Sequence, residues 1–178
     1  MLVCTPTASG KTLIAELAAL KSIIEEKGKA VYIVPLKALA SEKYKDFKKR
    51  YGKIAEIALS IGDIDSSDPY LAEYDLIVTT SEKLDSLIRH HSLWLSSIKT
   101  VVIDEIHLLN DPERGPTLEI LITILKKLLK NAQIIALSAT IGNAEELAEW
   151  LQAELVVDDW RPVKLHKGIY YDGKVEFY

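Results

Sequence analysis

Short apolar runs alternate along the chain with longer stretches in which apolar residues recur at helical spacing. The runs are rich in Val and Ile and do not alternate with polar residues, which is typical of strands buried on both faces. They are Leu2–Cys4, Ala30–Val34, Ile54–Leu59, Leu76–Val78, Val101–Ile103, Ile134–Leu137 and Leu155–Val157. The helical stretches are Lys11–Lys27, Leu36–Arg50, Ser81–His90, Arg114–Lys130 and Asn143–Leu151. This alternation predicts an α/β fold of three layers with a mostly parallel, doubly wound sheet.

Local patterns near the two ends of the chain predict a helix start, a terminal hairpin and the limits of the lobe. Asn143 occupies an N-cap position, and Glu146 stands three residues later as its capping-box partner. A break near Asp158–Pro162 is followed by two short apolar runs around Asp172-Gly173, which predict a hairpin over 169–178. We therefore expect one lobe over 1–160 and an exit segment with the start of a hairpin over 161–178. Because a core strand stands at the very start, we expect that preceding residues were cut away.

The composition of the chain favours a globular domain and argues against a membrane-spanning or disulfide-linked protein. The 178 residues are 48% hydrophobic and 27% charged, which is the balance of a globular domain. The longest apolar run, Leu118–Leu125, is far shorter than the roughly 18 residues of a membrane helix, so no membrane is expected. Cys4 is the single cysteine, which excludes an intrachain disulfide and favours a reducing, cytoplasmic location. The net charge of −4 means that any nucleic-acid binding has to be local.

The segment Thr5–Thr12 joins the first predicted strand to the first predicted helix. Gly10 allows the backbone to approach a phosphate, and the helix end behind it offers unpaired N–H groups. Lys11 can then reach the outer phosphates, and the Thr12 hydroxyl can bind Mg²⁺. Thr5 stands where the full phosphate-loop pattern has its first Gly. The alternative is an ordinary strand–helix turn with a surface lysine.

Two carboxylates end the strand Val101–Ile103. In phosphate-loop enzymes an Asp at this place holds Mg²⁺, and an adjacent Glu can position and deprotonate the attacking water. Asp104 and Glu105 match these roles, with His107 two residues further along. The alternatives are that Asp104 caps the next segment and that His107 is structural. Ser138-Ala139-Thr140 follows another strand in the same way and is informative only in combination with the first two motifs.

Together these segments resemble the first RecA-like lobe of superfamily 2 helicases, a phosphate-loop (P-loop) NTPase fold. Thr5–Thr12 is similar to motif I, Asp104–His107 (DEIH) to the DEAD/DEAH-box motif II, and Ser138–Thr140 to motif III. Five further segments resemble the Ski-like branch of this superfamily, and within it the archaeal Hjm-type DNA helicases. They are Pro35–Ala40, Ile61-Gly62-Asp63, Thr79–Leu87, Arg114–Glu119 and Asp159–Val163. The resemblance covers essentially the whole chain.

This resemblance implies a role for each matching residue. Thr7, Ala8, Ser9, Gly10, Lys11 and Thr12 would bind ATP, with Thr12 and Asp104 on Mg²⁺ and Lys11, Asp104 and Glu105 in catalysis. His107, Ser138 and Thr140 would couple the nucleotide state to the strand-binding surface. The residues implied to touch a single strand are Pro35, Lys37, Ala38, Gly62, Thr80, Ser81 and Lys83. For Lys37 and Lys83 a solvated lysine at a helix end is the alternative.

The function implied is the ATP-binding motor lobe of an ATP-dependent 3′–5′ DNA helicase of replication-fork repair and recombination. Its partners would be single-stranded nucleic acid, DNA rather than RNA, and a second RecA-like lobe with accessory domains of the parent chain. The lobe alone is expected to show little ATPase activity and no unwinding. An RNA helicase lobe of the same branch, another class of P-loop NTPase and a non-catalytic scaffold are the alternatives. The intact Lys11, Thr12, Asp104 and Glu105 favour an enzyme.

A run of basic residues lies in and just after the second predicted helix. Its members are Lys43, Lys45, Lys48, Lys49, Arg50 and Lys53. Although such a run invites a nucleic-acid interpretation, we interpret it as a solvated helix face.

Overall fold

A seven-stranded parallel sheet forms the middle layer of the computed structural model, which describes residues 1–62 and 66–177. The strand order is β3-β4-β2-β5-β6-β1-β7. The strands are β1 (Leu2–Cys4), β2 (Lys29–Val34), β3 (Ile57–Ser60), β4 (Leu76–Thr80), β5 (Ile98–Ile103), β6 (Gln133–Ser138) and β7 (Leu155–Val157). All adjacent pairs are parallel, so the carboxyl ends of all seven strands share one edge of the sheet. The predicted doubly wound α/β fold is confirmed.

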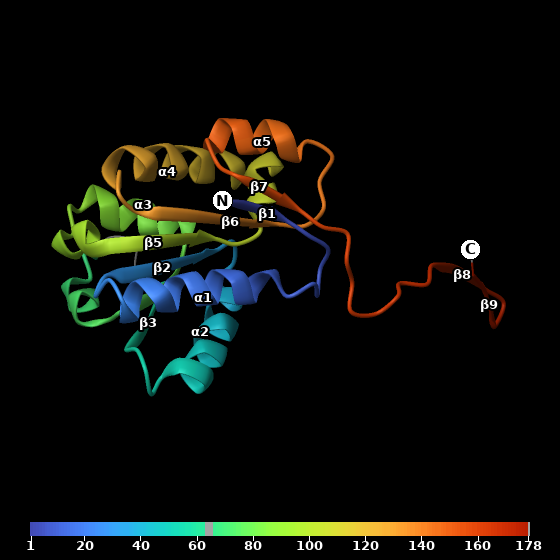
Figure 1. Cartoon of the computed structure of the whole chain (residues 1–178), viewed down its shortest axis with the longest axis horizontal. Helices are drawn as coiled ribbons and strands as arrows, with labels where there is room; N and C mark the ends of the chain where they lie inside the picture. Colours follow the sequence, from blue (N-terminus) through green and yellow to red (C-terminus); the bar gives the residue numbers. More distant parts are fainter. Residues whose placement is uncertain (63–65, 178) are drawn as a thin grey trace.

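Helices cover both faces of this sheet (Figure 1). One face carries α1 (Lys11–Ile24) and α2 (Lys37–Tyr51), and the other carries α3 (Ser81–Arg89), α4 (Gly115–Leu128) and α5 (Ala144–Leu151). Each face encloses its own hydrophobic cluster, because every central strand buries alternate side chains on opposite faces. Within the part of the chain that the structure describes, no helix is long and apolar enough to cross a membrane.

Three predicted features differ in the structure: a strand boundary, a helix cap and the burial of a strand. The strand predicted from Ile54 begins at Ile57, because the chain after α2 turns back with Ile54 and Ala55 bonded to the carbonyl of Tyr51. The capping box at Asn143 is wrong: Asn143 is the N-cap of α5, but its side chain makes no capping hydrogen bond. β7 is not buried on both faces, because it is an edge strand whose Val157 is exposed.

Among the described residues, three short 3-10 helices were not predicted from the sequence. They are η1 (Pro69–Glu73), η2 (Leu93–Ser97) and η3 (Ile106–Asn110). Each is only five residues long, which leaves too few apolar positions for a helical period to be seen. The third matters for function, because it begins directly after Glu105.

The tail beyond β7 extends away from the three layers (Figure 1). It ends in an antiparallel hairpin of β8 (Gly168–Tyr171) and β9 (Lys174–Phe177), as predicted. Asp172 and Gly173 both have positive φ, of 46° and 75°, which is the turn that Asp-Gly favours in a two-residue hairpin. Tyr178, the last residue of the predicted hairpin, lies outside the described residues.

Candidate nucleotide-binding site

The segment Thr5–Gly10 forms a tight loop between β1 and α1. Ala8 and Gly10 both have positive φ, of 66° and 90°, and only Gly accepts this conformation without strain. Thr5 does not adopt such a backbone, and its hydroxyl lies 2.7 Å from that of Ser9. A threonine is therefore compatible with the place where the full pattern has its first glycine.

Lys11 begins α1 and is folded back toward the loop. Its ammonium lies 3.5 Å from the carbonyl oxygen of Thr5, and the residue is only 8% exposed. The first N–H groups of α1 have no helical carbonyl partners, so this helix end favours an anion. The loop, the helix end and the lysine therefore lie together, as the predicted phosphate-binding site requires; that they bind phosphate stays a prediction.

Two oxygen ligands meet beside this loop. Thr12 Oγ1 lies 3.2 Å from the ammonium nitrogen of Lys43, and Asp104 Oδ2 lies 3.6 Å from the same nitrogen. Both oxygens therefore converge on one cation, although Thr12 and Asp104 are 92 residues apart in the sequence. A hydroxyl and a carboxylate are hard oxygen donors of the kind that Mg²⁺ prefers. The donor set fits the predicted metal.

The described residues contain no group of three or more His, Cys, Asp or Glu that could hold a metal by themselves. Mg²⁺ is usually bound through one or two protein oxygens together with phosphate oxygens and water. Thr12 and Asp104 would supply the protein share of such a site.

Tyr32 orients the Asp104 carboxylate. Its hydroxyl donates a hydrogen bond of 2.9 Å to Asp104 Oδ2 from the middle of β2. Burial raises the pKa of Tyr32 well above its usual range, and the nearby charge of Asp104 raises it further. The phenol therefore stays a donor at any ordinary pH. Sequence reasoning missed Tyr32, because a tyrosine within an apolar strand carries no motif.

Glu105 stands in a left-handed backbone conformation directly after the strand end. Its φ of 54° is unusual for a non-glycine residue and costs on the order of 1–3 kcal/mol. The Glu105 N–H donates to Asp104 Oδ1 at 3.0 Å, which links the two carboxylate residues. His107 Nδ1 lies 3.4 Å from Glu105 Oε2 but forms no hydrogen bond with it. Such backbone strain is concentrated at functional sites.

The third predicted motif lies beside the phosphate loop. Ser138 ends β6, and its carbonyl oxygen accepts a 3.3 Å hydrogen bond from the N–H of Thr5. Thr140 follows on the surface. A groove of about 590 Å³ separates the loop after Thr140 from η3 and is lined in part by His107 and Asn143. Of the predicted coupling residues, Ser138 therefore lies beside the phosphate loop and His107 lies beside Glu105.

The residues predicted to touch a nucleic-acid strand fall into two groups. All of them lie at or just after the carboxyl ends of the adjacent strands β2, β3 and β4, which topology brings together. The half-buried or exposed ones are Pro35, Lys37, Ala38 and Gly62, whereas the buried ones are Thr80, Ser81 and Lys83. Asp63, next to Gly62 in the family-like turn, lies outside the described residues.

Lys83 and Thr80 already have protein partners. The Lys83 ammonium forms a 3.0 Å ion pair with Asp68, and the Lys83 side chain is only 2% exposed. The Thr80 hydroxyl accepts the Lys83 N–H at 3.4 Å and caps α3. In this structure both residues support the local fold. Their contact with a strand stays a prediction, and for Lys83 it requires the ion pair with Asp68 to open.

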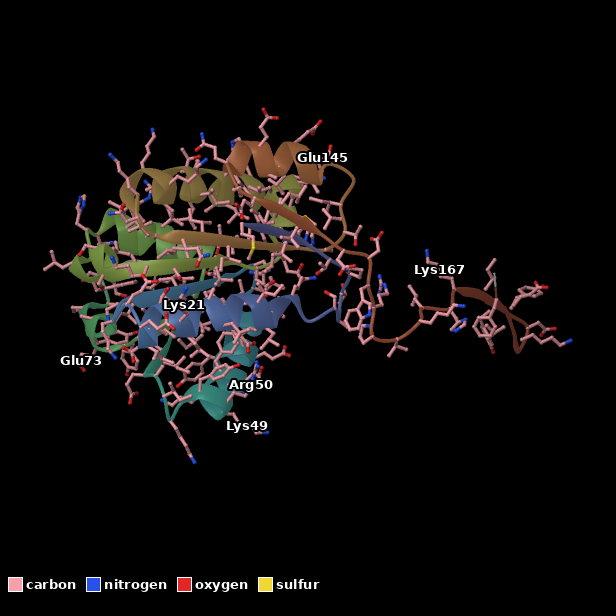
Figure 2. The ribbon with its side chains drawn as sticks, viewed as in Figure 1. Lys21, Lys49, Arg50, Glu73, Glu145 and Lys167 are labelled. Atoms are coloured by element: carbon pink, nitrogen blue, oxygen red, sulfur yellow. The ribbon has the colours of Figure 1, made fainter. Side chains whose placement is uncertain are left out.

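One member of the basic run on α2, Lys43, points inward, so the prediction of a solvated face is wrong for it, whereas Arg50 stays exposed. Lys43 reaches Thr12 and Asp104, and Arg50 donates to Glu16 of α1 at 2.8 Å. Helical spacing offered a signal, because Lys43 lies between the buried residues Ala40 and Phe47 on the same helix face. Lys49 extends outward, in agreement with the prediction (Figure 2).

The parallel sheet, the phosphate-binding loop at its carboxyl edge and the converging Thr12 and Asp104 oxygens define a P-loop nucleotide-binding lobe. Comparison with known proteins is more specific. The family model of DEAD/DEAH box helicases matches residues 1–147. The chain belongs to the DEAD/DEAH box helicase family, and the resemblance to helicases seen in the sequence is confirmed.

Individual relatives agree with this family. The chain is 58% identical over 175 residues to the ATP-dependent DNA helicase Hel308 of Pyrococcus abyssi, covering 98% of this chain and 24% of the relative. It is also 58% identical over 182 residues to Hel308 of Methanocaldococcus jannaschii, covering 99% and 15%. A crystal structure of the DUF1998 helicase MrfA bound to DNA superposes with a TM-score of 0.75 at 30% identity, covering 89% of this chain and 25% of that one. The chain thus spans about a quarter or less of these proteins.

Proposed function

We propose that this chain is the ATP-binding motor lobe of an ATP-dependent DNA helicase. The observation that carries the proposal is the convergence of Thr12 and Asp104 on one cation beside the phosphate loop. The Hel308 relatives are named ATP-dependent DNA helicases, and the MrfA structure contains DNA. These names favour ATP over other nucleotides and DNA over RNA.

The nucleotide would be held by this chain's own loop and helix end. Lys11 would neutralise the outer phosphates, while the backbone N–H groups of Thr7–Gly10 and the start of α1 would bind their oxygens. Thr12 and Asp104 would hold Mg²⁺, which when bound offsets the negative charge that develops on the transferred phosphoryl group. Tyr32 would keep the Asp104 carboxylate in place through the 2.9 Å hydrogen bond.

Glu105 is the proposed catalytic base. Its carboxylate can accept a proton from the water that attacks the γ-phosphate, which is the role of a base at this position in phosphoryl transfer. The left-handed backbone at Glu105 makes it the N-cap of η3, with His107 inside that short helix. A change at Glu105 would therefore reach His107 and the groove beside Thr140.

The strand-binding surface would lie at the carboxyl ends of β2, β3 and β4. We propose that exposed Lys37 neutralises a backbone phosphate there and that Pro35, Ala38 and Gly62 let the strand approach closely. Residues 1–160 would form this lobe and 161–178 an exit segment. A second RecA-like lobe of the same parent chain would close over the nucleotide, and stepping 3′→5′ along the bound strand would follow.

The first test is ATP binding by isothermal calorimetry with Mg²⁺ present. Wild type should bind ATP, and Lys11→Ala should weaken that binding at least about 30-fold, because a charged hydrogen bond to phosphate is lost. Lys21→Ala, an exposed lysine of the same helix (Figure 2), is the matched control and should bind as wild type does. Equal affinity in wild type and Lys11→Ala would contradict the proposal.

A further inference from the structure

The Lys43 ammonium is held between two oxygen atoms instead of extending into solvent. A lysine on a helix next to solvent normally extends its ammonium into water, where it is best hydrated. The Lys43 side chain is only 24% exposed, and its ammonium lies between Thr12 Oγ1 and Asp104 Oδ2 at 3.2 Å and 3.6 Å. It also lies 5.5 Å from the ring centre of Tyr32. Four elements, α1, α2, β2 and the end of β5, therefore contribute to holding one ammonium group.

The charge balance explains why the ammonium stays there. The Asp104 carboxylate is 8% exposed and has lost most of its hydration, so it needs a compensating charge. Tyr32 supplies a neutral hydrogen bond to Asp104, whereas Lys43 supplies a full positive charge. The aromatic face of Tyr32 adds a further favourable contact with the ammonium.

The same two oxygens are the ones assigned to magnesium in the proposed function, on which this inference rests. Magnesium binds oxygens at about 2.0–2.1 Å and carries two positive charges. An ammonium that contacts both oxygens competes with such an ion for the same space and repels it electrostatically. The two cations exclude each other.

We propose that Lys43 is a tethered counter-ion of the metal site, which has to leave Thr12 and Asp104 before magnesium-loaded nucleotide binds. The displacement costs the favourable Lys43–Asp104 interaction each time. Lys43 therefore lowers the affinity for Mg²⁺ with ATP, and stabilises the lobe when nucleotide is not bound. A neutral side chain of similar length at this position should remove both effects.

The experiment measures the magnesium gain, defined as the ratio of ATP affinity with Mg²⁺ to ATP affinity in EDTA. Calorimetry would compare wild type, Lys43→Met and Lys49→Met, the last being the exposed, charge-matched control on the same helix. We expect the magnesium gain of Lys43→Met to rise about tenfold, the order of a partly buried charge interaction. Lys49→Met should match wild type, and Lys43→Arg, which retains the charge, should stay close to it.

Thermal unfolding gives a readout that needs no nucleotide. In EDTA, Lys43→Met should unfold at a lower temperature than Lys49→Met, because Asp104 loses its counter-ion. Adding MgCl₂ alone should raise the unfolding temperature of Lys43→Met more than that of wild type. If Lys43→Met does not fold, Lys43→Gln, which keeps a polar end, replaces it in both measurements.

The outcomes separate this inference from the proposed function. If wild type binds ATP, Lys11→Ala does not, and Lys43→Met has an unchanged or lower magnesium gain, the counter-ion role is wrong while the proposed function stands. If wild type itself binds no ATP, the proposed function and this inference both fall.

Discussion

Three neighbouring residues hold the Asp104 carboxylate in place and compensate its charge. Tyr32 donates to one oxygen, the Glu105 N–H donates to the other, and Lys43 neutralises the charge. Each of these partners comes from a different element, so the carboxylate is fixed from several directions. A buried carboxylate held in this way is compatible with hard metal chemistry and costs little further ordering when the metal binds.

Removing the phenol hydroxyl tests this arrangement. Tyr32→Phe should lower the free energy of unfolding by about 0.5–1.5 kcal/mol, because one buried hydrogen bond is lost. The edge-to-face contact with Phe47, at 5.1 Å between ring centres, is retained. Calorimetry should show ATP binding with Mg²⁺ weakened a few-fold and ATP binding in EDTA nearly unchanged. A change of the same size in both conditions would mean that Tyr32 acts only on the fold.

At the scale of elements, the buried ion pair between α3 and the segment before η1 is a second feature with measurable consequences. Burial opposes ionisation of Asp68, but hydrogen bonds from Ser66, Lys83 and Ser60 outweigh it and hold the pKa of Asp68 below its usual range. A depressed folded-state pKa means that the stabilisation is complete above the unfolded value near 4. It is lost as the pH falls through the lower folded value.

The prediction is therefore a pH-dependent effect of Asp68→Asn. At pH 7 the variant should lose roughly 1.5–3 kcal/mol of unfolding free energy, because Lys83 loses its charged hydrogen bond to Asp68 while it keeps those to Ser66. The difference from wild type should shrink as the pH falls below 4. Urea unfolding between pH 7 and pH 3 measures it. Asp46→Asn, at a half-exposed helix pair, is the control and should change stability by about 0.5 kcal/mol or less.

The arrangement of the elements explains which site residues could be predicted from the sequence and which could not. The places of Gly10, Lys11 and Asp104 in the fold were predictable, because they depend on neighbours in the chain and on a strand end that periodicity locates. Lys43 was assigned to a solvated face, because its partners Thr12 and Asp104 lie 31 and 61 residues away. Such contacts depend on the order of the strands in the sheet, where β5 and β6 lie between β1 and β2.

The predicted strand-binding residues show the same limit. A motif assigns Thr80 and Lys83 to a surface, but a motif contains no information about burial. In the fold, a segment before η1 covers this strand end and provides Asp68 as a partner for Lys83. Lys37 and Gly62, by contrast, are exposed.

On the scale of the whole molecule, the lobe supplies one side of a nucleotide site. An arginine finger that completes a nucleotide site from outside the binding lobe is worth about 10³–10⁵ in rate in phosphoryl-transfer enzymes. We therefore expect this chain to bind ATP but to hydrolyse it at least about 10³-fold more slowly than a full-length Hel308 relative under the same conditions. Phosphate release under saturating ATP measures both. A chain that hydrolyses ATP as fast as the full-length protein would contradict this expectation.

The single thiol of the chain has a practical consequence for experiments on motion. Cys4 is 1% exposed inside β1, and burial raises the pKa of its thiol, so little reactive thiolate is present while the domain is folded. A second cysteine placed at an exposed position such as Lys49 or Thr140 would react with a maleimide dye far faster than Cys4. Fluorescent or spin labels can thus be attached at chosen points without replacing the native cysteine, and the distance between two such points can be measured in solution.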